Sequence, residues 1–447
     1  MDSAGKALAA PPGRGSPASI GRKRQETIYT AGFAGRSLPV PVSPDRLEAA
    51  ALRKLGRDAG AYFAGGAGLE RTAAANRAAF EHCRIVPRAM RDVSTRDLRV
   101  ELFGRTLPLP IQLGPIGVLE MAHREADLPA ARAASAAGIP FVASSQASRP
   151  MEQIAAAMGN GPRWFQLYWS SRNELTASFV ERAEKAGFEA IVVTVDTTLL
   201  GWRVRDLDRG YLPFMRGRGL ANYTSDPVFS QLPMEGGALP KPPRPGPGAL
   251  KSVLELLRSF PARAVLSGEA LAAVRRFIAI YSRPDLTWED LPFLRERTRL
   301  PILLKGIVHP GDAARAVEAG VDGLIVSNHG GRQVDGAVAA LHALPGVADA
   351  VAGRIPVLFD SGVRTGADIF KALCLGAKAV LIGRPYVYGL ALAGERGVGD
   401  VIANLAAELD LTLGLAGRRS LGELDRSAVA FDHGAIPAAL NPYPAAP

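Results

Sequence analysis

Residues 301–332 read PILLKGIVHPGDAARAVEAGVDGLIVSNHGGR, and this stretch contains the structural unit from which the rest of the fold can be inferred. Two short apolar runs, 301–307 and 323–329, flank a helical pattern over 311–319 that stops at Gly320. Continuous apolar strands that alternate with helices are typical of parallel sheets, in which both faces of each strand are buried. The stretch therefore predicts a strand, a helix and a second strand parallel to the first.

The same unit recurs along the chain, often with a glycine after the helix. The expected strands are Pro110–Gly114, Pro140–Ser145, Arg163–Tyr168, Ala190–Asp196, Pro301–Ile307, Gly323–His329, Pro356–Val363 and Ala379–Pro385. An open doubly wound sheet and a closed barrel both fit this alternation. Eight units favour a (β/α)8 TIM barrel, whose active sites lie at the carboxyl ends of the strands.

One long interval, between the fourth and fifth expected strands, interrupts this alternation. Residues 206–285 are interpreted as an inserted lid or loop, because the aromatic residues in it would be wasteful in a solvated linker. Residues 1–40 are rich in Gly, Ala, Pro, Ser and Arg without periodicity, which predicts a disordered basic tail. The expected organisation is thus a tail (1–40), a barrel domain (41–435) and a short C-terminal tail (436–447).

Composition narrows the class of protein. The 447 residues are 47% hydrophobic and 21% charged, which is an ordinary globular balance. Cys83 and Cys374 form no CxxC pair, which argues against a disulfide framework, a structural zinc site and an oxidising compartment. With no apolar run of membrane-spanning length and no apolar signal region, a cytoplasmic location without a membrane span is expected.

The net charge of +10 is concentrated in two segments. Residues 1–40 carry six Lys/Arg against two Asp/Glu, and residues 203–283 carry thirteen against six. Basic segments can serve nucleic acids, membrane surfaces or acidic small substrates. No dense Lys/Arg run with interleaved aromatic residues occurs, so nucleic-acid binding is disfavoured.

The strongest chemical signal follows the strand at 323–329. His329 can act as a base near neutral pH, and Arg332 can hold a carboxylate with two hydrogen bonds. Asp196 ends another strand and could orient a histidine, while Lys305 ends a third. Each residue alone also fits a purely structural role: a histidine in a turn, an arginine at the surface, an aspartate that caps a helix or turn, and a lysine at a strand end. Their shared position at strand ends favours an active site.

Two later segments are typical of a phosphate site. Asp360, Gly362 and Arg364 follow the seventh expected strand, and Gly383 and Arg384 follow the eighth. Barrels often bind phosphate at these two strand ends, with backbone N–H groups and a helix N-terminus facing the anion. The GxGxxG pattern of a Rossmann nucleotide site is absent. No metal site is expected.

Together these segments resemble the FMN-dependent 2-hydroxy-acid oxidase and dehydrogenase family over residues 45–435, with SNHGGRQ (327–333) close to a family signature. The resemblance implies FMN as the cofactor, His329 as the base, Asp196 as its partner and Lys305 beside the flavin. It implies carboxylate clamps at Arg332 and Arg203. The remaining matches are substrate tyrosines Tyr62 and Tyr168, flavin contacts Pro115, Ile116, Gly117, Ser144, Gln166, Thr194 and Ser327, and the ribityl and phosphate contacts Asp360, Gly362, Arg364, Gly383 and Arg384.

Departures from the glycolate oxidase pattern indicate a subgroup. Gln146 replaces a tryptophan, and Gly117 replaces an alanine that commonly lies beside flavin N5. Gly117, the Gly-Trp-Arg run and the long insertion resemble lactate monooxygenase more than the oxidases. The resemblance therefore implies oxidation of an L-2-hydroxy acid, weighted toward lactate, with oxygen as acceptor and oxidative decarboxylation. It also implies a homo-oligomer, commonly a tetramer. The sequence leaves the hydride and carbanion routes undistinguished.

Other functions stay open at this point. The nearest are a 2-hydroxy-acid oxidase that releases H2O2 and a dehydrogenase that passes electrons to a quinone or a protein. Another FMN barrel enzyme, such as an isopentenyl diphosphate isomerase or a nucleotide dehydrogenase, is disfavoured by Arg332 and its His-Gly-Gly-Arg context. A non-catalytic flavin-binding protein would lack the base, a clamp or the flavin lysine, and none is lacking.

Overall fold

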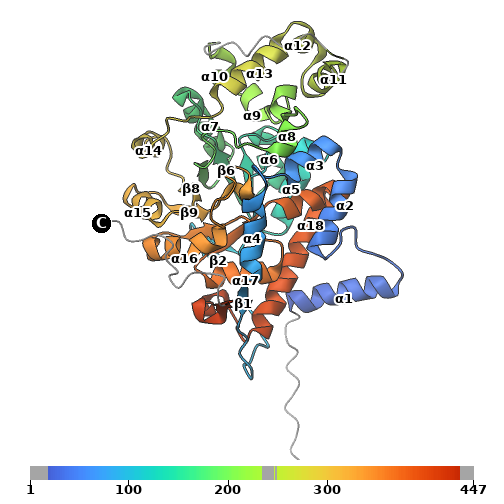
Figure 1. Ribbon diagram of the computed structural model, residues 1–447, viewed down its shortest axis with the longest axis vertical. Coiled ribbons are helices and arrows are strands. Elements are labelled where there is room, and N and C mark those ends of the chain that lie inside the picture. Colours follow the sequence, from blue (N-terminus) through green and yellow to red (C-terminus); the bar gives the residue numbers. More distant parts are fainter. Residues whose placement is uncertain (1–18, 234–245, 247–248, 433–447) are drawn as a thin grey trace, which may run out of the picture.

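Eight parallel strands close into a barrel in the computed structural model, which describes residues 19–233, 246 and 249–432 (Figure 1). The strands follow one another around the barrel in chain order, and the last pairs with the first. All eight expected strands are confirmed, and with them the (β/α)8 fold class. They are β4 (Ile111–Leu113), β5 (Phe141–Ser144), β6 (Arg163–Leu167), β7 (Ile191–Thr194), β8 (Ile302–Ile307), β9 (Gly323–Val326), β10 (Val357–Phe359) and β11 (Ala379–Ile382).

Helices cover the outside of the barrel (Figure 1). Strand residues that point outward pack against these helices in the main hydrophobic core, so each strand is apolar on both faces. The covering helices are α5 (Leu128–Ala136), α6 (Met151–Met158), α7 (Asn173–Lys185), α14 (Leu291–Arg295), α15 (Pro310–Glu318), α16 (Ala340–Val351), α17 (Gly366–Cys374) and α18 (Arg384–Leu415), the last interrupted at Ala393 and Gly394.

The amino end of the barrel is filled by a hairpin of β2 (Val100–Leu102) and β3 (Arg105–Leu107). Val100, Leu102 and Leu107 join the inward-facing strand residues, among them Trp164, in a second buried apolar cluster. Phe103 at the turn lies edge-on to Trp164, with ring centroids 5.6 Å apart. The barrel interior is therefore packed at this end, and polar groups gather at the other.

The prediction of a disordered tail is wrong for residues 19–40. Helix α1 (Ile20–Phe33) packs along α18, where Asp410 accepts hydrogen bonds from the Ser19 hydroxyl (2.6 Å) and the Gly21 amide (2.9 Å). Arg24 forms an ion pair with Asp400 at 2.8 Å. This order arises from contacts with a distant helix, which the local sequence does not reveal. Residues 1–18 and the predicted tail 436–447 lie outside the described residues.

Three further helices precede the barrel: α2 (Pro44–Lys54), α3 (Arg57–Ala64) and α4 (Arg71–Glu81). After them β1 (Cys83–Ile85) pairs with β12 (Val429–Phe431), near the C-terminal end of the described chain. Cys83 and Cys374 are free and buried, and burial raises the pKa of the Cys374 thiol to about 12. Among the described helices, none is both long and apolar enough to cross a membrane.

The insertion between β7 and α14 is a layer of short helices above one end of the barrel (Figure 1). Tyr211, Phe214, Tyr223 and Phe229 are all buried, as their sequence context predicts. Of the Pro-rich stretch 238–248 only Gly246 lies within the described residues. The helices are α8 (Val204–Leu207), α9 (Ala221–Thr224), α10 (Pro227–Gln231), α11 (Ala249–Ser259), α12 (Ala262–Leu266) and α13 (Glu269–Ile280).

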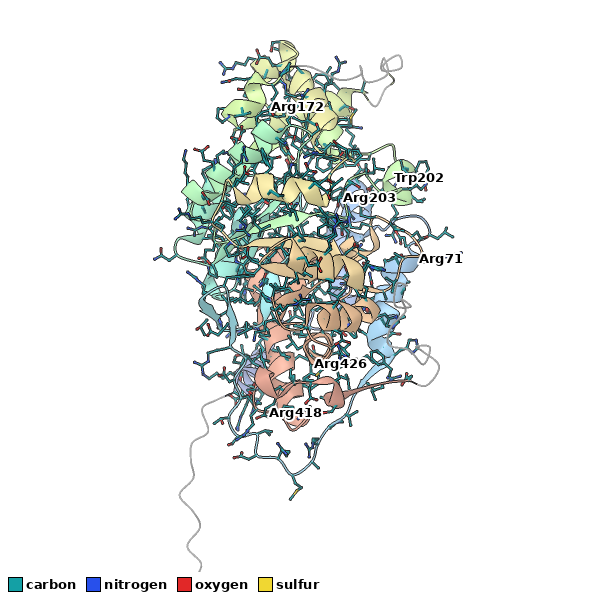
Figure 2. All side chains as sticks on the ribbon, turned by 90° about the vertical axis from the view of Figure 1, so that its left-hand side faces the viewer. Arg71, Arg172, Trp202, Arg203, Arg418 and Arg426 are labelled. Atoms are coloured by element: carbon teal, nitrogen blue, oxygen red, sulfur yellow. The ribbon has the colours of Figure 1, made fainter. Side chains whose placement is uncertain are left out.

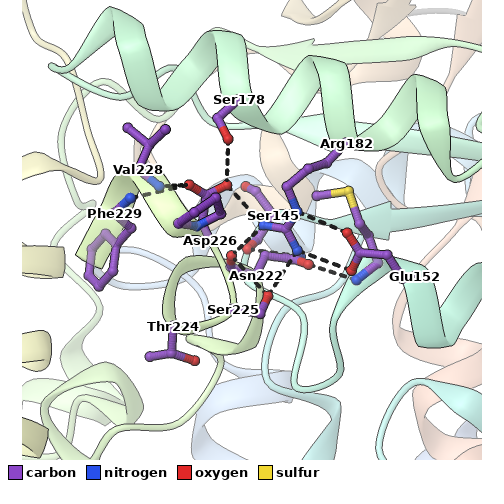
Figure 3. Close-up of polar contacts among 12 residues, drawn as sticks. Ser145, Glu152, Ser178, Arg182, Asn222, Thr224, Ser225, Asp226, Val228 and Phe229 are labelled. Atoms are coloured by element: carbon purple, nitrogen blue, oxygen red, sulfur yellow. Dashed lines mark hydrogen bonds and ion pairs between the residues drawn. The ribbon is translucent and has the colours of Figure 1, made fainter. Parts of the chain in front are cut away.

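A buried carboxylate fixes the insertion to the barrel (Figure 3). Asp226 accepts hydrogen bonds from the amides of Val228 (2.8 Å) and Phe229 (3.2 Å) and so caps α10. It also accepts from the Ser178 hydroxyl (2.8 Å) and the Arg182 guanidinium (3.0 Å), both on α7. One side chain thus joins a helix start in the insertion to a helix of the barrel wall.

We expect Asp226→Ala to lower the free energy of unfolding by about 3–5 kcal/mol, because Arg182 would lose a buried partner and α10 its cap. Equilibrium urea denaturation measures the change. Glu181→Ala is the control, on the helix α7 that carries Arg182, because the exposed ion pair of Glu181 with Lys185 contributes little. Equal urea midpoints for the two variants would show that the cluster is no more stabilising than a surface pair.

Candidate active site

A cavity lies at the carboxyl ends of the barrel strands, with about 1040 Å³ of empty space when the open solvent at its mouth is included. Four of the predicted residues do not line it. Asp196, Ser144, Gln166 and Ser327 instead contact residues that do, or one another. The predicted residues that line the cavity are Tyr62, Pro115, Ile116, Gly117, Tyr168, Thr194, Arg203, Lys305, His329, Arg332, Asp360, Gly362, Arg364, Gly383 and Arg384.

His329, which follows β9, and Asp196, which follows β7, form a hydrogen-bonded pair at the barrel mouth. His329 Nδ1 lies 2.9 Å from Asp196 Oδ1. Because an ionised carboxylate only accepts, this contact places the proton on Nδ1 and leaves Nε2 free to accept one. His329 has a left-handed backbone (φ 57°), and the Ser327 hydroxyl accepts from its amide at 3.0 Å. A strained residue held in this way is common at functional sites.

The electrostatics of the pair favour a neutral histidine beside a charged aspartate. Burial lowers the pKa of His329, and the nearby charge of Asp196 opposes that shift only in part. Burial alone would raise the pKa of Asp196, but the charge that His329 carries when it is protonated, the hydrogen bond with His329 and the charge of Lys305 outweigh burial, so that pKa is lowered. Asp196 therefore stays ionised and stabilises any proton that His329 accepts.

Arg203 and Arg332 face the same cavity without a carboxylate partner among the described residues. Arg203, only 7% exposed, donates to the Arg332 carbonyl (3.3 Å) and to Oε1 of Gln333 (3.1 Å). Arg332 donates to the carbonyls of Gly65 (3.1 Å) and Tyr62. Burial and the charge of Arg203 lower the pKa of Arg332 to about 9. Two close guanidinium groups of this kind form a site for a small anion.

The residue beside Arg203 points the other way. Trp202 lies at the edge of the molecule with 72% of its surface exposed, whereas Arg203 lies further inside (Figure 2). Both belong to the Gly-Trp-Arg run that follows β7. These two consecutive side chains thus point in different directions, Trp202 into solvent and Arg203 into the cavity.

Lys305 is a buried cation whose ammonium group has an anionic partner and a hydrogen-bonding partner. Its Nζ lies 2.9 Å from Asp360 Oδ2 and 2.9 Å from the Ser327 hydroxyl. Burial alone would lower the pKa of Lys305, but the charges of Asp360 and Asp196 raise it, so the ammonium group stays charged. A fixed positive charge on the cavity floor favours a ligand that becomes anionic during reaction.

Orphaned polar atoms beneath the cavity fit the flavin that the sequence resemblance implies. Gln166 Nε2 and Thr194 Oγ1, at the ends of β6 and β7, are buried without a hydrogen-bond partner in the described chain. Such atoms are costly unless a ligand satisfies them. The Ser144 hydroxyl donates to Gln166 Oε1 at 3.0 Å and so directs the amide nitrogen of Gln166 away from β5. The polar edge of an isoalloxazine ring carries the complementary acceptors and donor.

The phosphate end is built at β10 and β11. Helix α18 begins at Arg384 without a side-chain cap, whereas α17 is capped by Thr365 and Asp368. Pro385 has no N–H group and the Tyr386 amide donates to the Gly383 carbonyl (3.2 Å), so among the first three residues of α18 it is the Arg384 amide that can face an anion. Arg384 donates to three backbone carbonyls, and burial lowers the pKa of Arg364 to about 10. These residues fit the phosphate of FMN.

Several lining residues had no signal in the sequence. The Thr197 hydroxyl donates to Asp196 Oδ1 (2.9 Å), and Ser361 accepts from the amides of Asn328 and Gly330. Leu200, Phe214 and Tyr281 also line the cavity, the last two from the insertion. A position directly after Asp196 could have singled out Thr197. For Phe214 and Tyr281, the sequence shows only an aromatic-rich insertion.

Comparisons with known proteins agree with this geometry. The family model described as FMN-dependent dehydrogenase matches residues 51–431. The chain is 42% identical to the FMN-dependent alpha-hydroxy acid dehydrogenase qulF of Penicillium citrinum, over 91% of this chain and 94% of that one. It is 43% identical to an L-lactate oxidase of Lysinibacillus sphaericus, over 86% and 91%.

A solved structure shows the same likeness in three dimensions. The crystal structure of mandelate oxidase superposes with a TM-score of 0.70 at 37% identity, covering 88% of this chain and 99% of that one. The sequence match covers nearly the whole chain, and the cavity holds groups suited to a flavin. The protein therefore belongs to the FMN-dependent dehydrogenase family and is an FMN-dependent 2-hydroxy-acid oxidoreductase.

Proposed function

We propose that the protein oxidises an L-2-hydroxy acid to the 2-keto acid with oxygen as the electron acceptor, and that it decarboxylates the product in the manner of a lactate 2-monooxygenase. The observation that supports the oxidation is the pair formed by His329 Nδ1 and Asp196 Oδ1, 2.9 Å apart, beside a cavity that also holds two arginines with no ion pair among the described residues. Oxidation of a hydroxy acid requires a base for its proton and cationic groups that bind its carboxylate, and this cavity contains both.

The proposed roles follow from these contacts. Arg203 and Arg332 bind the substrate carboxylate, and the hydroxyls of Tyr62 and Tyr168 contact the substrate. His329 Nε2 accepts the proton, from the hydroxyl group in a hydride route or from C2 in a carbanion route. Asp196 stabilises the imidazolium that results, since it already accepts the Nδ1 proton. Binding fixes the reacting carbon before the proton moves.

FMN supplies the acceptor for the two electrons that leave the substrate. We propose that Gln166, Thr194, Ser144 and Ser327 hold its ring, together with the segment from Pro115 to Gly117. Lys305 would offset negative charge that develops there. Asp360, Gly362, Arg364, Gly383 and Arg384 would hold its ribityl chain and phosphate. In this arrangement the protein provides orientation and fixed charge around the cofactor.

The insertion supports the decarboxylation. Phe214 and Tyr281 belong to the insertion and line the cavity from above the barrel, where they would retain the keto acid. Peroxide formed beside a retained keto acid would decarboxylate it to a shorter acid, CO2 and water. If the keto acid left first, the products would be the keto acid and H2O2. The relatives include an L-lactate oxidase, so the oxidase outcome is the second candidate.

We expect the holoenzyme, mixed with L-lactate under air, to yield acetate and CO2 with little H2O2. Gly117→Ala should raise the H2O2 yield, because a methyl group there lies 3.1 Å from Gln146 Cβ and narrows the space in which keto acid and oxygen meet. Product analysis with a peroxide assay measures both. Stoichiometric pyruvate and H2O2 from the wild type would identify an oxidase, and flavin that is reduced but reoxidised only by a quinone or protein would identify a dehydrogenase.

We expect His329→Gln to slow anaerobic flavin reduction by L-lactate about 10²- to 10⁴-fold, because the proton acceptor is lost. Stopped-flow absorbance measures the rate, and the flavin spectrum shows whether FMN remains bound. His82→Gln, at an exposed histidine that lies beside Asp432 and does not line the cavity, is the matched control. A normal rate in His329→Gln would remove His329 from the reaction.

The acid limb of kcat/KM should lie below pH 6.5. His329 must be neutral to accept a proton, and burial lowers its pKa from 6.5, so activity falls only as the pH drops through this lowered pKa. Asp196→Asn removes a charge that raises that pKa, so the limb should move to still lower pH while kcat decreases. A limb that moves upward in Asp196→Asn would contradict the proposed pairing.

A further inference from the structure

We propose that Gln146 selects substrates, favouring 2-hydroxy acids whose side chain ends in a neutral hydrogen-bonding group such as a carboxamide. This inference rests on the proposed function, because it concerns the part of the same cavity that receives the substituent on C2. It names a specificity-determining residue and a substrate class that the comparisons with relatives leave open.

The order of the strands places Gln146 opposite the base. Gln146 follows β5 and His329 follows β9, which are four strands apart in either direction around the closed barrel. The proposed clamps Arg203 and Arg332 follow β7 and β9. A substrate with its carboxylate and hydroxyl group held on that side extends its C2 substituent across the mouth, toward the ends of β4, β5 and β6.

Gln146 is a mostly buried residue whose side-chain amide reaches the cavity. Gln146 is 7% exposed, and its backbone is fixed on both sides, by the Ser144 hydroxyl at its amide (3.0 Å) and the Val118 amide at its carbonyl (3.0 Å). In the described chain no hydrogen bond engages its side chain, which lines the cavity. Its Nε2 and Oε1 atoms are not among the fully buried polar atoms that lack a partner, so they are open to the cavity, where a ligand can accept from one and donate to the other.

The absence of a side chain at Gly117 makes room for the Gln146 side chain. A Cβ built on Gly117 would lie 3.1 Å from Gln146 Cβ and 3.5 Å from its Oε1. The side chain therefore packs over Gly117, at the end of the neighbouring strand β4. This contact holds the amide at the cavity wall, where one amide can both donate to and accept from a ligand.

The surroundings of Gln146 favour an uncharged ligand group. The lining residues that follow β4, β5 and β6 are Pro115, Ile116, Gly117, Gln146 and Tyr168, none of them charged at neutral pH. The charged lining residues lie on β8 (Lys305) or follow β7, β9, β10 and β11. A charged substituent would thus lose water beside Gln146 without gaining an opposite charge.

Apolar side chains line the same cavity, and one of them, Phe214, lies near Gln146 beside Gly219. Leu200, Phe214 and Tyr281 line it, and Phe277 packs against the last two with ring centroids 5.2 and 5.0 Å away. These rings are fixed by packing and offer contact to the methylene part of a substituent. An apolar passage with one amide along its wall matches a side chain that is apolar at C3 and polar at its end.

The test compares two substrates of nearly equal shape, L-2-hydroxy-4-methylpentanoate and its carboxamide isostere, L-2-hydroxysuccinamate. Anaerobic stopped-flow reduction of the holoenzyme gives the ratio of their second-order rate constants. We expect the wild type to prefer the carboxamide about 10-fold, because the branched alkyl group leaves the Gln146 amide unpaired. L-lactate serves as a common reference for both.

Gln146→Met keeps the length of the side chain and removes the amide, so it should reverse the preference in favour of the alkyl substrate. Gln153→Met, at an exposed position on α6, is the matched control and should keep the wild-type ratio. The FMN content of each variant is read from its absorption spectrum. The wild-type ratio tests the proposal even if Gln146→Met does not fold.

Two outcomes would overturn the inference alone. In one, the wild type reduces its flavin with the alkyl substrate at least as fast as with the carboxamide. In the other, Gln146→Met slows L-lactate and both isosteres by the same factor, which would assign the amide to the cofactor. A wild-type flavin that stays oxidised with all three acids would instead overturn the proposed function, and the inference with it.

Discussion

Closure of the sheet is the constraint on which the other features of this protein depend. Because β11 pairs with β4, every strand has two neighbours and all eight carboxyl ends meet on one rim. Asp196, Lys305, His329 and Asp360 are spread over more than 160 positions of the chain, yet they lie within one hydrogen-bonded cluster. An open sheet would arrange the same strand ends in a row. Only a ring can face a base from one strand with an amide from the opposite strand.

The rim carries more positive than negative charge. Arg203, Lys305, Arg332, Arg364 and Arg384 line the cavity, against the carboxylates of Asp360 and, just beneath it, Asp196. Such an excess in a partly buried space destabilises the empty protein, because each cation loses hydration. It is offset when anions bind. In the proposed arrangement the phosphate of FMN and the carboxylate of a hydroxy acid would supply that charge, so the same excess would serve cofactor and substrate.

The sequence allowed prediction of the features that recur with a period or concentrate at strand ends. The alternation of apolar strands with glycine-terminated helices predicted the barrel, and the residues around His329 predicted where the active site lies. Contacts between distant segments could not be predicted. Helix α1 owes its position to Asp410 and Asp400 on α18, and neither is marked by local pattern. The same holds for Phe214 and Tyr281, whose places in the cavity depend on how the insertion packs. That Gln146 differs from the tryptophan of glycolate oxidases was visible in the sequence, but its unpaired amide was not.

The hairpin of β2 and β3 determines how substrate enters the cavity and how product leaves it. With Val100, Leu102, Leu107 and Trp164 packed into the amino end of the barrel, the barrel axis is shut from below within the described chain. A molecule that reaches the cavity must pass the rim, beneath the insertion, and must return the same way. Substrate and product therefore use the same opening, so a product that leaves obstructs a substrate that enters. Accumulated product slows turnover because it occupies this opening as well as the binding site.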